Sequence, residues 1–134
     1  MSDHTTAAYK RPTRKIYRVE HSERGHGAWY DHDGNFCPAP TPLRDVPMPY
    51  SQYLSANNLL SATKTLKELR LFFDKNNMKK LIELGFKIVE LEVLESAISE
   101  NYCNGNKRAY VNFTRDSVIA VWDISFADMF KEVL

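Results

Sequence analysis

The sequence has little of what marks several classes of protein. Two cysteines, Cys37 and Cys103, stand in 134 residues, which is too few for a disulfide framework and fits a reducing compartment. Neither sign of charge dominates, because 18 lysines and arginines are set against 17 aspartates and glutamates. This balance argues against a nucleic-acid binder. The sequence has no apolar run long enough to span a membrane, and its first 15 residues lack the apolar segment of a signal peptide. We therefore expect a cytoplasmic protein.

Motifs for common chemistries are also missing. The sequence contains no phosphate-binding loop, no G-x-G-x-x-G after a strand and no G-x-S-x-G. The spacing from His21 through His26 and His32 to Cys37 does not match a zinc finger or ribbon. We expect no metal site and predict no catalytic residue from motifs alone.

The composition is sufficient for one compact domain. Hydrophobic residues make up 43% of the chain and aromatic residues 12%, which is enough to build a core. Residues 1–14 are polar and carry Lys10, Arg11 and Arg14, so we predict a flexible basic arm there. Residues 15–134 are predicted to form a single domain.

The hydrophobic pattern places strands first, helices in the middle and further strands after them. Thr65 and Glu68 have the spacing of a helix capping box, and Gly85 is placed to end a second helix that buries Met78, Leu81 and Ile82. We predict an α+β fold with a small mixed or antiparallel sheet, two central short helices and a C-terminal helix. The predicted strands are 16–20, 86–94, 109–114 and 118–124, and the predicted helices are 65–73, 76–84 and a last one that uses Phe126, Met129, Phe130 and Val133. In the ambiguous segment 50–61, a short helix at 51–56 and a short strand at 59–61 both fit the pattern, and 96–106 is predicted to be a connection.

Two strands carry particular expectations. The run VIAVW, residues 118–122, is apolar on both faces and is predicted to be central in its sheet. Glu90 and Glu92 share one face of their strand, where a carboxylate pair can do acid–base work. We expect that pair to face water instead.

Arg18 stands out because it lies inside an otherwise apolar strand. A buried arginine is costly unless it meets an anion, and its planar fork suits a phosphate or a carboxylate. Two hypotheses remain open, an anion-binding arginine in a cleft and a salt bridge to Glu20, Glu23 or a glutamate across the sheet.

A segment rich in aromatic residues and proline follows this strand. Such a surface is typical of the anchor residues that dominate protein–protein contacts, although the same side chains would also serve to cover the sheet. The predicted partner-binding residues are Trp29, Tyr30, Phe36, Tyr50 and Tyr53.

The order of these elements resembles a known family. KIYRVEH, residues 15–21, resembles the opening strand of ADP-ribosyltransferase-fold proteins of the arginine–serine–glutamate type, and NLLSATKTLKELRLFF, residues 58–73, resembles their second strand and helix. LGFKIVELEV and KRAYVNF resemble the later strands. The same order resembles small proteins carried by phages and prophages, which begin with Y-R-V-E-H and later show G-F and x-V-x-F strands. The resemblance covers about residues 15–115.

The resemblance implies a nucleotide site and also a defect in it. Arg18 would meet a phosphate or ribose of NAD, and Ser61 or Thr63 would take the place of the serine at the end of the second strand. The catalytic glutamate of the family would precede the strand 109–113, but Lys107 and Arg108 stand there. A basic residue opposes the positive charge that develops as nicotinamide leaves.

The resulting hypothesis is a phage- or mobile-element-encoded accessory protein with a catalytically degenerate ADP-ribosyltransferase-like fold. It would bind and inhibit a bacterial host protein, such as a defence protein, or a nucleotide, in the host cytoplasm and without a required cofactor. The alternative is an active mono-ADP-ribosyltransferase that uses NAD to modify a host protein. A third hypothesis is an interaction module in which Arg18 is only salt-bridged.

Overall fold

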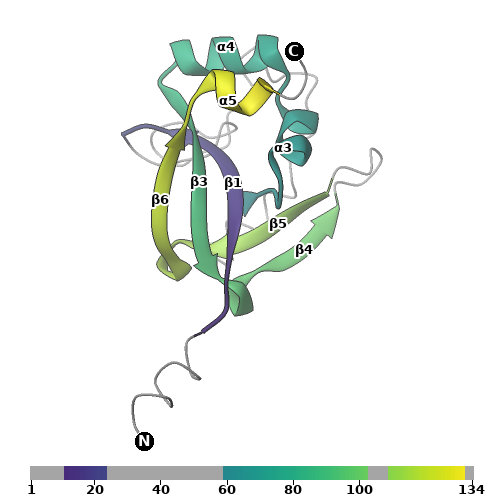
Figure 1. Cartoon of the computed structure of the whole chain (residues 1–134), viewed down its shortest axis with the longest axis vertical. Coiled ribbons are helices and arrows are strands. Elements are labelled where there is room, and N and C mark those ends of the chain that lie inside the picture. Colours follow the sequence, from purple (N-terminus) through teal and green to yellow (C-terminus); the bar gives the residue numbers. More distant parts are fainter. Residues whose placement is uncertain (1–10, 24–58, 103–108, 132–134) are drawn as a thin grey trace, which may run out of the picture.

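A computed structural model describes residues 11–23, 59–102 and 109–131. Within them the chain forms two three-stranded antiparallel sheets and three short α-helices (Figure 1). The elements are, in chain order, β1 (Thr13–His21), β2 (Leu59–Ala62), α3 (Leu66–Phe72), α4 (Lys75–Glu83), β3 (Phe86–Leu94), the 3₁₀ turn η2 (Glu95–Ala97), β4 (Ser99–Tyr102), β5 (Ala109–Thr114), the 3₁₀ turn η3 (Arg115–Ser117), β6 (Val118–Ile124) and α5 (Phe126–Phe130).

The two sheets are joined through β1. The first sheet has the order β1-β3-β6 and the second β2-β5-β4. Figure 1 shows the first sheet upright, with β5 and β4 running obliquely beside its lower half and α4 and α5 above its upper end. Tyr17 and Thr63 exchange two backbone hydrogen bonds of 2.8 Å, which tie β1 to the chain just after β2. Because β1 is bonded on both sides, it is held more firmly than an ordinary edge strand.

Two hydrophobic clusters form the core, one on each face of the first sheet. Alternation along a strand sends successive side chains to opposite faces, so Ile88 joins one cluster and Val89 the other. The helical core lies between the first sheet and the helices and contains Val19, Leu69, Phe72, Phe73, Met78, Leu81, Phe86, Ile88, Tyr110, Met129 and Phe130. The intersheet core contains Ile16, Ala62, Val89, Leu91, Val93, Val111 and Phe113.

The helices begin and end where local chemistry predicts. The Thr65 hydroxyl accepts a hydrogen bond from the backbone N–H of Glu68, and Asp74 and Asn77 form a complete capping box at the start of α4. Gly85 follows α4 with φ +94°, a left-handed conformation that favours glycine. These helices are too short to be stable alone, so their packing on the helical core holds them in place.

Most predicted elements are confirmed, and the α+β order is confirmed with them. The strands at 86–94, 109–114 and 118–124 are present, as is a strand at Leu59–Ala62. The strand at the start of the domain begins at Thr13, so the end of the predicted arm belongs to the sheet. Residues 1–10 of that arm, the candidate helix at 51–56 and Val133 lie outside the described residues.

Four expectations were wrong in detail. The strands divide into two sheets rather than one. The connection 96–106 contains a strand, β4, which pairs with β5. Ile82 is exposed, because it lies on the solvent side of α4. The run VIAVW forms β6 at the edge of the first sheet, not its centre. Within the described residues this strand pairs on one side only, and the apolar pattern alone does not distinguish such a strand from a buried one.

Candidate functional site

Arg18 lies between the two sheets and is held there by polar partners. Alternation in β1 turns its side chain toward the second sheet, and the residue is only 3% exposed. Its Nε donates to Oε1 of Glu20 at 3.0 Å, and its Nη1 donates to the backbone carbonyl of Ser61 at 2.7 Å. The guanidinium carbon lies 6.0 Å from the centre of the Phe113 ring. Arg18 therefore links β1 to β2 across the intersheet core.

Glu20 is the carboxylate at the centre of this cluster. It is 7% exposed and meets a second guanidinium, since Nη2 of Arg115 donates to the same Oε1 at 3.2 Å. Arg115 begins η3 directly after β5, so the turn at the end of β5 delivers this charge. We call Arg18, Glu20 and Arg115 the charged triad. The salt bridge to Glu20 that the sequence left open is the contact that the structure shows.

Ser61 and Thr63, the other predicted nucleotide-binding residues, lie close to Arg18. Ser61 meets Arg18 through its carbonyl rather than its hydroxyl. Thr63 is buried, and its hydroxyl donates to the carbonyl of Thr65 at 2.8 Å, at the start of α3. The three residues are thus brought together, but these contacts serve the joint between β1, β2 and α3. The proposed counterparts of the missing glutamate, Lys107 and Arg108, lie outside the described residues.

Asn112 is a buried polar residue that the sequence analysis did not single out. It is opposite Ser61 on one side and Ser99 on the other. Its Oδ1 is buried, and no donor within the described part of the chain lies in hydrogen-bonding range of it. A polar residue within the apolar run AYVNF was the available signal.

The carboxylates and tyrosine on the other face of the first sheet form a separate polar row. Glu90 lies 3.6 Å from Nζ of Lys15, and Glu92 accepts a 2.6 Å hydrogen bond from the hydroxyl of Thr13. Burial first, and then a hydrogen bond and charge repulsion from Glu90, raise the pKa of Tyr17. The two glutamates are partly exposed and structurally engaged, so this arrangement offers no paired acid and base.

The outer edge of β6 presents apolar side chains to solvent. Ile119 is 56% exposed, Val121 48% and Trp122 44%, and Figure 1 shows β6 at the outer side of the first sheet. A β-bulge at this point leaves Ile119 unpaired with β3, since Ala120 is opposite Glu92 while Val118 is opposite Val93. We call Ile119, Val121 and Trp122 the β6 edge surface. These residues were predicted to be buried, because the sequence pattern placed their strand at the centre of the sheet.

Other predicted features lie beyond what the structure describes. The aromatic partner-binding residues Trp29, Tyr30, Phe36, Tyr50 and Tyr53 are all outside the described ranges.

His21 is buried and packs edge-to-face on Phe86, with ring centres 5.3 Å apart. In residues 11–23, 59–102 and 109–131, no group of three or more metal-ligating side chains comes together. The helices in the same ranges all lack the length and apolar character to cross a membrane.

The described residues form a small α+β protein with a buried charged triad and an edge strand, β6, that pairs with β3 alone among them. A family model described as Bacteriophage T4 Y00F protein matches residues 11–127, and the chain belongs to that family. It is therefore a small phage-encoded protein. No curated protein and no solved structure matches it significantly.

Proposed function

We propose that this phage protein is a non-catalytic accessory protein that binds a protein of the bacterial host in the host cytoplasm. The β6 edge surface is the observation that carries the proposal. A strand with one unpaired edge is a template for a further strand. Most proteins protect such an edge with lysine, proline or a covering loop. In β6 the only charged residue is Asp123, near its end, where it lies 3.3 Å from Nζ of Lys87.

The composition of the β6 edge surface favours a protein partner. Tryptophan is among the residues that contribute most to protein interfaces. Nζ of Lys15 lies 5.1 Å from the Trp122 ring centre, and Lys15 also pairs with Glu90. Val121 and Trp122 lie on opposite faces of β6, so a strand added along its edge would contact both of them, one on each face. In this proposal, a strand of the partner extends the first sheet and packs apolar residues against Val121 and Trp122.

The non-catalytic part of the proposal rests on the charged triad. A nucleotide phosphate at Arg18 would have to displace Glu20 and the Ser61 carbonyl from a guanidinium that is almost wholly buried. Removing such partners leaves buried polar groups unsatisfied, which is costly. In this proposal, the chain keeps a fold that resembles ADP-ribosyltransferases but lacks the catalytic glutamate of that family. The resemblance to phage-carried proteins favours inhibition of a defence protein as the consequence of binding.

Capture of host proteins on the tagged chain tests the proposal. Val121→Lys places a charge in the β6 edge surface, and Ile82→Lys is the matched control because Ile82 is a similarly exposed apolar residue on α4. We expect Val121→Lys to lose a host protein that both wild type and Ile82→Lys retain, with unchanged melting temperatures. The captured protein is then identified and titrated in pure form against all three chains.

Three results would overturn the proposal or redirect it. Equal capture by both variants would remove β6 as the docking edge. A dimer of the purified chain that Val121→Lys dissociates would make a second copy, rather than a host protein, the strand that pairs with β6. Transfer of label from NAD to host lysate proteins, lost in the more conservative Arg18→Lys variant, would replace a binding protein with an enzyme.

A further inference from the structure

β6 offers only a short stretch of regular strand to a partner. Five successive residues, Ala120 to Ile124, are opposite β3 without a break in register. Before them, the bulge at Ile119 interrupts the pairing. After them, the carbonyl of Ser125 accepts a 3.0 Å hydrogen bond from the N–H of Met129, so the backbone there belongs to α5. A partner strand can therefore pair regularly with β6 over about 17 Å.

Both faces of this stretch are largely apolar. Ala120, Trp122 and Ile124 lie on the side of the helical core, because Ile88 of that core is opposite Ile124. Val121 lies on the other side, because Leu91 of the intersheet core is opposite it. Trp122 is 44% exposed and Val121 48%. A strand laid along β6 therefore covers this apolar surface only if its own side chains are apolar on both faces.

Strands of folded proteins seldom meet that requirement and remain available. An exposed strand of an antiparallel sheet usually packs one face on its own core and turns a polar face to water. A strand that is apolar on both faces usually lies inside a sheet, where both of its edges are already paired. A segment without a fold of its own has neither constraint, and extended peptides are known to add a strand to an exposed sheet edge. The two apolar faces of β6 therefore favour such a segment.

A second copy of β6 is a folded strand with the required apolar faces, but it complements β6 poorly. Two antiparallel copies centred on Val121 would place Asp123 beside Ile119 of the other copy. Centred on Trp122, they would place Asp123 opposite Val121. Either arrangement sets a carboxylate whose side chain is 75% exposed against an apolar residue, and removing it from water without a partner is unfavourable.

Asp123 also bears on the charge of the partner segment. Its carboxylate already lies 3.3 Å from Nζ of Lys87, but both side chains are exposed, so this ion pair contributes little. A side chain directly opposite Asp123 on an added strand would lie about 5 Å away, where opposite charges attract and like charges repel. A lysine or arginine is therefore favoured at that position, and an acidic residue is disfavoured.

We propose that β6 binds a short, extended segment of the host protein that has no fold of its own before binding. The segment is apolar on both faces and carries one basic residue, opposite Asp123. This inference rests on the proposed docking of a host protein at β6 and specifies the kind of segment that docks there.

Selection from a displayed library of random peptides on the immobilised wild-type chain tests the inference. We expect the enriched peptides to share a run of about five residues that is apolar except at one position, where lysine or arginine predominates. The same selection on Asp123→Lys should enrich aspartate or glutamate at that position. Enrichment of runs that alternate apolar and polar residues, or no common run, would overturn the inference.

The most enriched peptide is then labelled and titrated against variants by fluorescence anisotropy. Val121→Lys should weaken its binding at least about tenfold, because a charge replaces an apolar contact. Asp123→Lys should weaken it about fivefold, because a cross-strand attraction becomes a repulsion. Lys87→Met removes the present partner of Asp123 and should strengthen binding. If neither Asp123→Lys nor Lys87→Met changes the affinity, the segment has no basic residue opposite Asp123.

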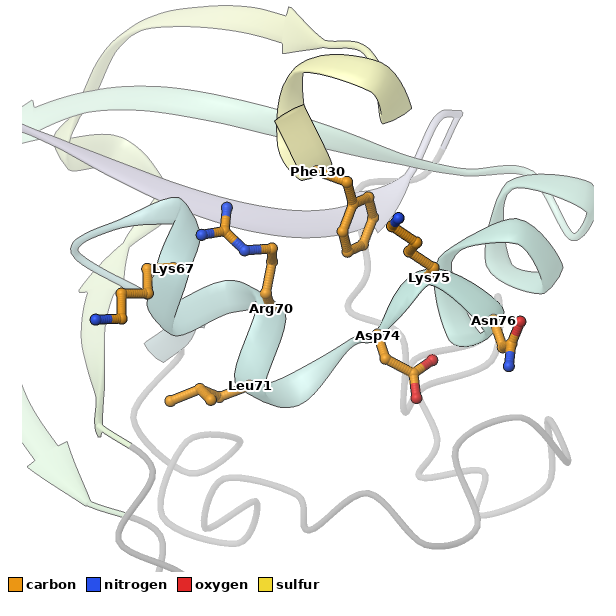
Figure 2. Close-up of a pocket in the computed structure, with 7 residues that line it drawn as sticks. All are labelled: Lys67, Arg70, Leu71, Asp74, Lys75, Asn76 and Phe130. Atoms are coloured by element: carbon orange, nitrogen blue, oxygen red, sulfur yellow. The ribbon is translucent and has the colours of Figure 1, made fainter. Parts of the chain in front are cut away.

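A groove between α3, the start of α4 and α5 is the rival place for an apolar peptide (Figure 2). Leu71 lines this groove and is 53% exposed, which is close to the exposure of Val121. Leu71→Lys is therefore the matched control, and it should bind the peptide as wild type does. Weaker binding to Leu71→Lys, with unchanged binding to Val121→Lys, would place the peptide in the groove and overturn the inference.

Competition between the peptide and a captured host protein separates this inference from the proposed function. We expect the peptide to displace the host protein from the wild-type chain. Host capture that depends on Val121 but persists at saturating peptide would keep the docking at β6 and overturn the extended segment. Peptide binding that depends on Val121, with no host protein captured, would instead count against the proposed function.

Discussion

The two strands that flank β3 reverse the usual distribution of charged and apolar residues. β1 buries Arg18, Glu20 and His21, whereas β6 exposes Ile119 and Trp122. Both strands pair with β3 in antiparallel register. The difference is what covers them. β1 has the second sheet on one face, helices over part of the other, and the Tyr17–Thr63 bridge along its outer edge. Among the described residues, β6 pairs with β3 alone.

The comparison shows that burial of a strand in this fold depends on whether the second sheet or the helices cover it, rather than on the residue pattern of the strand. A charged residue beneath a covering layer must be paired, because a buried unpaired charge is very costly. An apolar residue on an uncovered edge costs little in the folded monomer, and it remains available for a partner. β1 therefore contributes to folding, and β6 is the strand that the proposed partner would extend.

The largest expected effect comes from breaking the charged triad. In Arg18→Met, Glu20 stays buried, and the half-exposed Arg115 is its remaining cationic partner among the described residues. We expect it to lower the free energy of unfolding by about 3 kcal/mol, as for other broken buried pairs. Urea denaturation measures this change. Arg14→Met is the control, because the exposed Arg14–Glu95 pair should contribute less than about 1 kcal/mol.

The double variant Arg18→Met with Glu20→Leu sharpens that test. Replacing both partners by apolar residues removes the uncompensated charge, so much of the lost stability should return. If the double variant is less stable than either single variant, the pair stabilises the fold by more than mutual neutralisation. Equal effects of Arg18→Met and Arg14→Met would mean that the triad is not buried in solution.

The next effect compares β1 and β6 in a single row of the sheet. Ile16 and Val121 are both opposite Leu91, one from each side. Ile16 is fully buried, whereas Val121 is about half exposed. Ile16→Ala should cost about 3 kcal/mol because it leaves a cavity in the intersheet core. Val121→Ala should cost less than about 1 kcal/mol. Similar costs in urea denaturation would show that β6 is covered in the free protein.

The sequence was sufficient to predict most of the individual elements, though not β4, because most of them carry a local signal. Thr65 with Glu68, Gly85 after α4, and the alternation of 86–94 all act over a few residues. The division into two sheets could not be predicted, because it depends on pairing between distant strands such as β2 and β5. For the same reason, VIAVW resembled a central strand: its composition is apolar, but which neighbours it has is a property of the tertiary structure.

The candidate site was predictable only in part. Arg18 stood out as a charge in an apolar strand, and Glu20 was among its expected partners. Arg115 was not, because only the return of β5 beside β2 brings it to Glu20.

A smaller effect is expected where β1 ends against the turn after α4. An added Cβ at Gly85 would lie 2.9 Å from Nε2 of the buried His21, and the φ of +94° is unfavourable for any other residue. Gly85→Ala should therefore cost about 2 kcal/mol. In the double variant with His21→Ala, the close contact is gone but the backbone penalty remains, so the additional cost of Gly85→Ala should be smaller but not zero. Thermal or urea unfolding of wild type, the two single variants and the double variant separates the cost of the close contact from the cost of the backbone conformation.

The smallest effect concerns a second row that crosses the whole first sheet, in which Tyr17 and Trp122 are opposite Glu90 from either side. Burial and Glu90 raise the pKa of Tyr17 above its ordinary value of 10.0. Folding therefore favours the protonated phenol. This contribution is complete below the pKa of the unfolded chain and is lost as the pH rises through the higher pKa of the folded state.

Urea denaturation at a series of alkaline pH values measures this contribution. Wild type should lose stability over that range more steeply than Tyr17→Phe, which has no phenol to ionise. Trp122→Phe changes the other end of the row but leaves the phenol in place, so it should retain the wild-type slope. If Tyr17→Phe and wild type follow the same pH profile, the surroundings of Tyr17 in β1 do not disfavour its ionisation. The contrast between β1 and β6 would then be limited to packing.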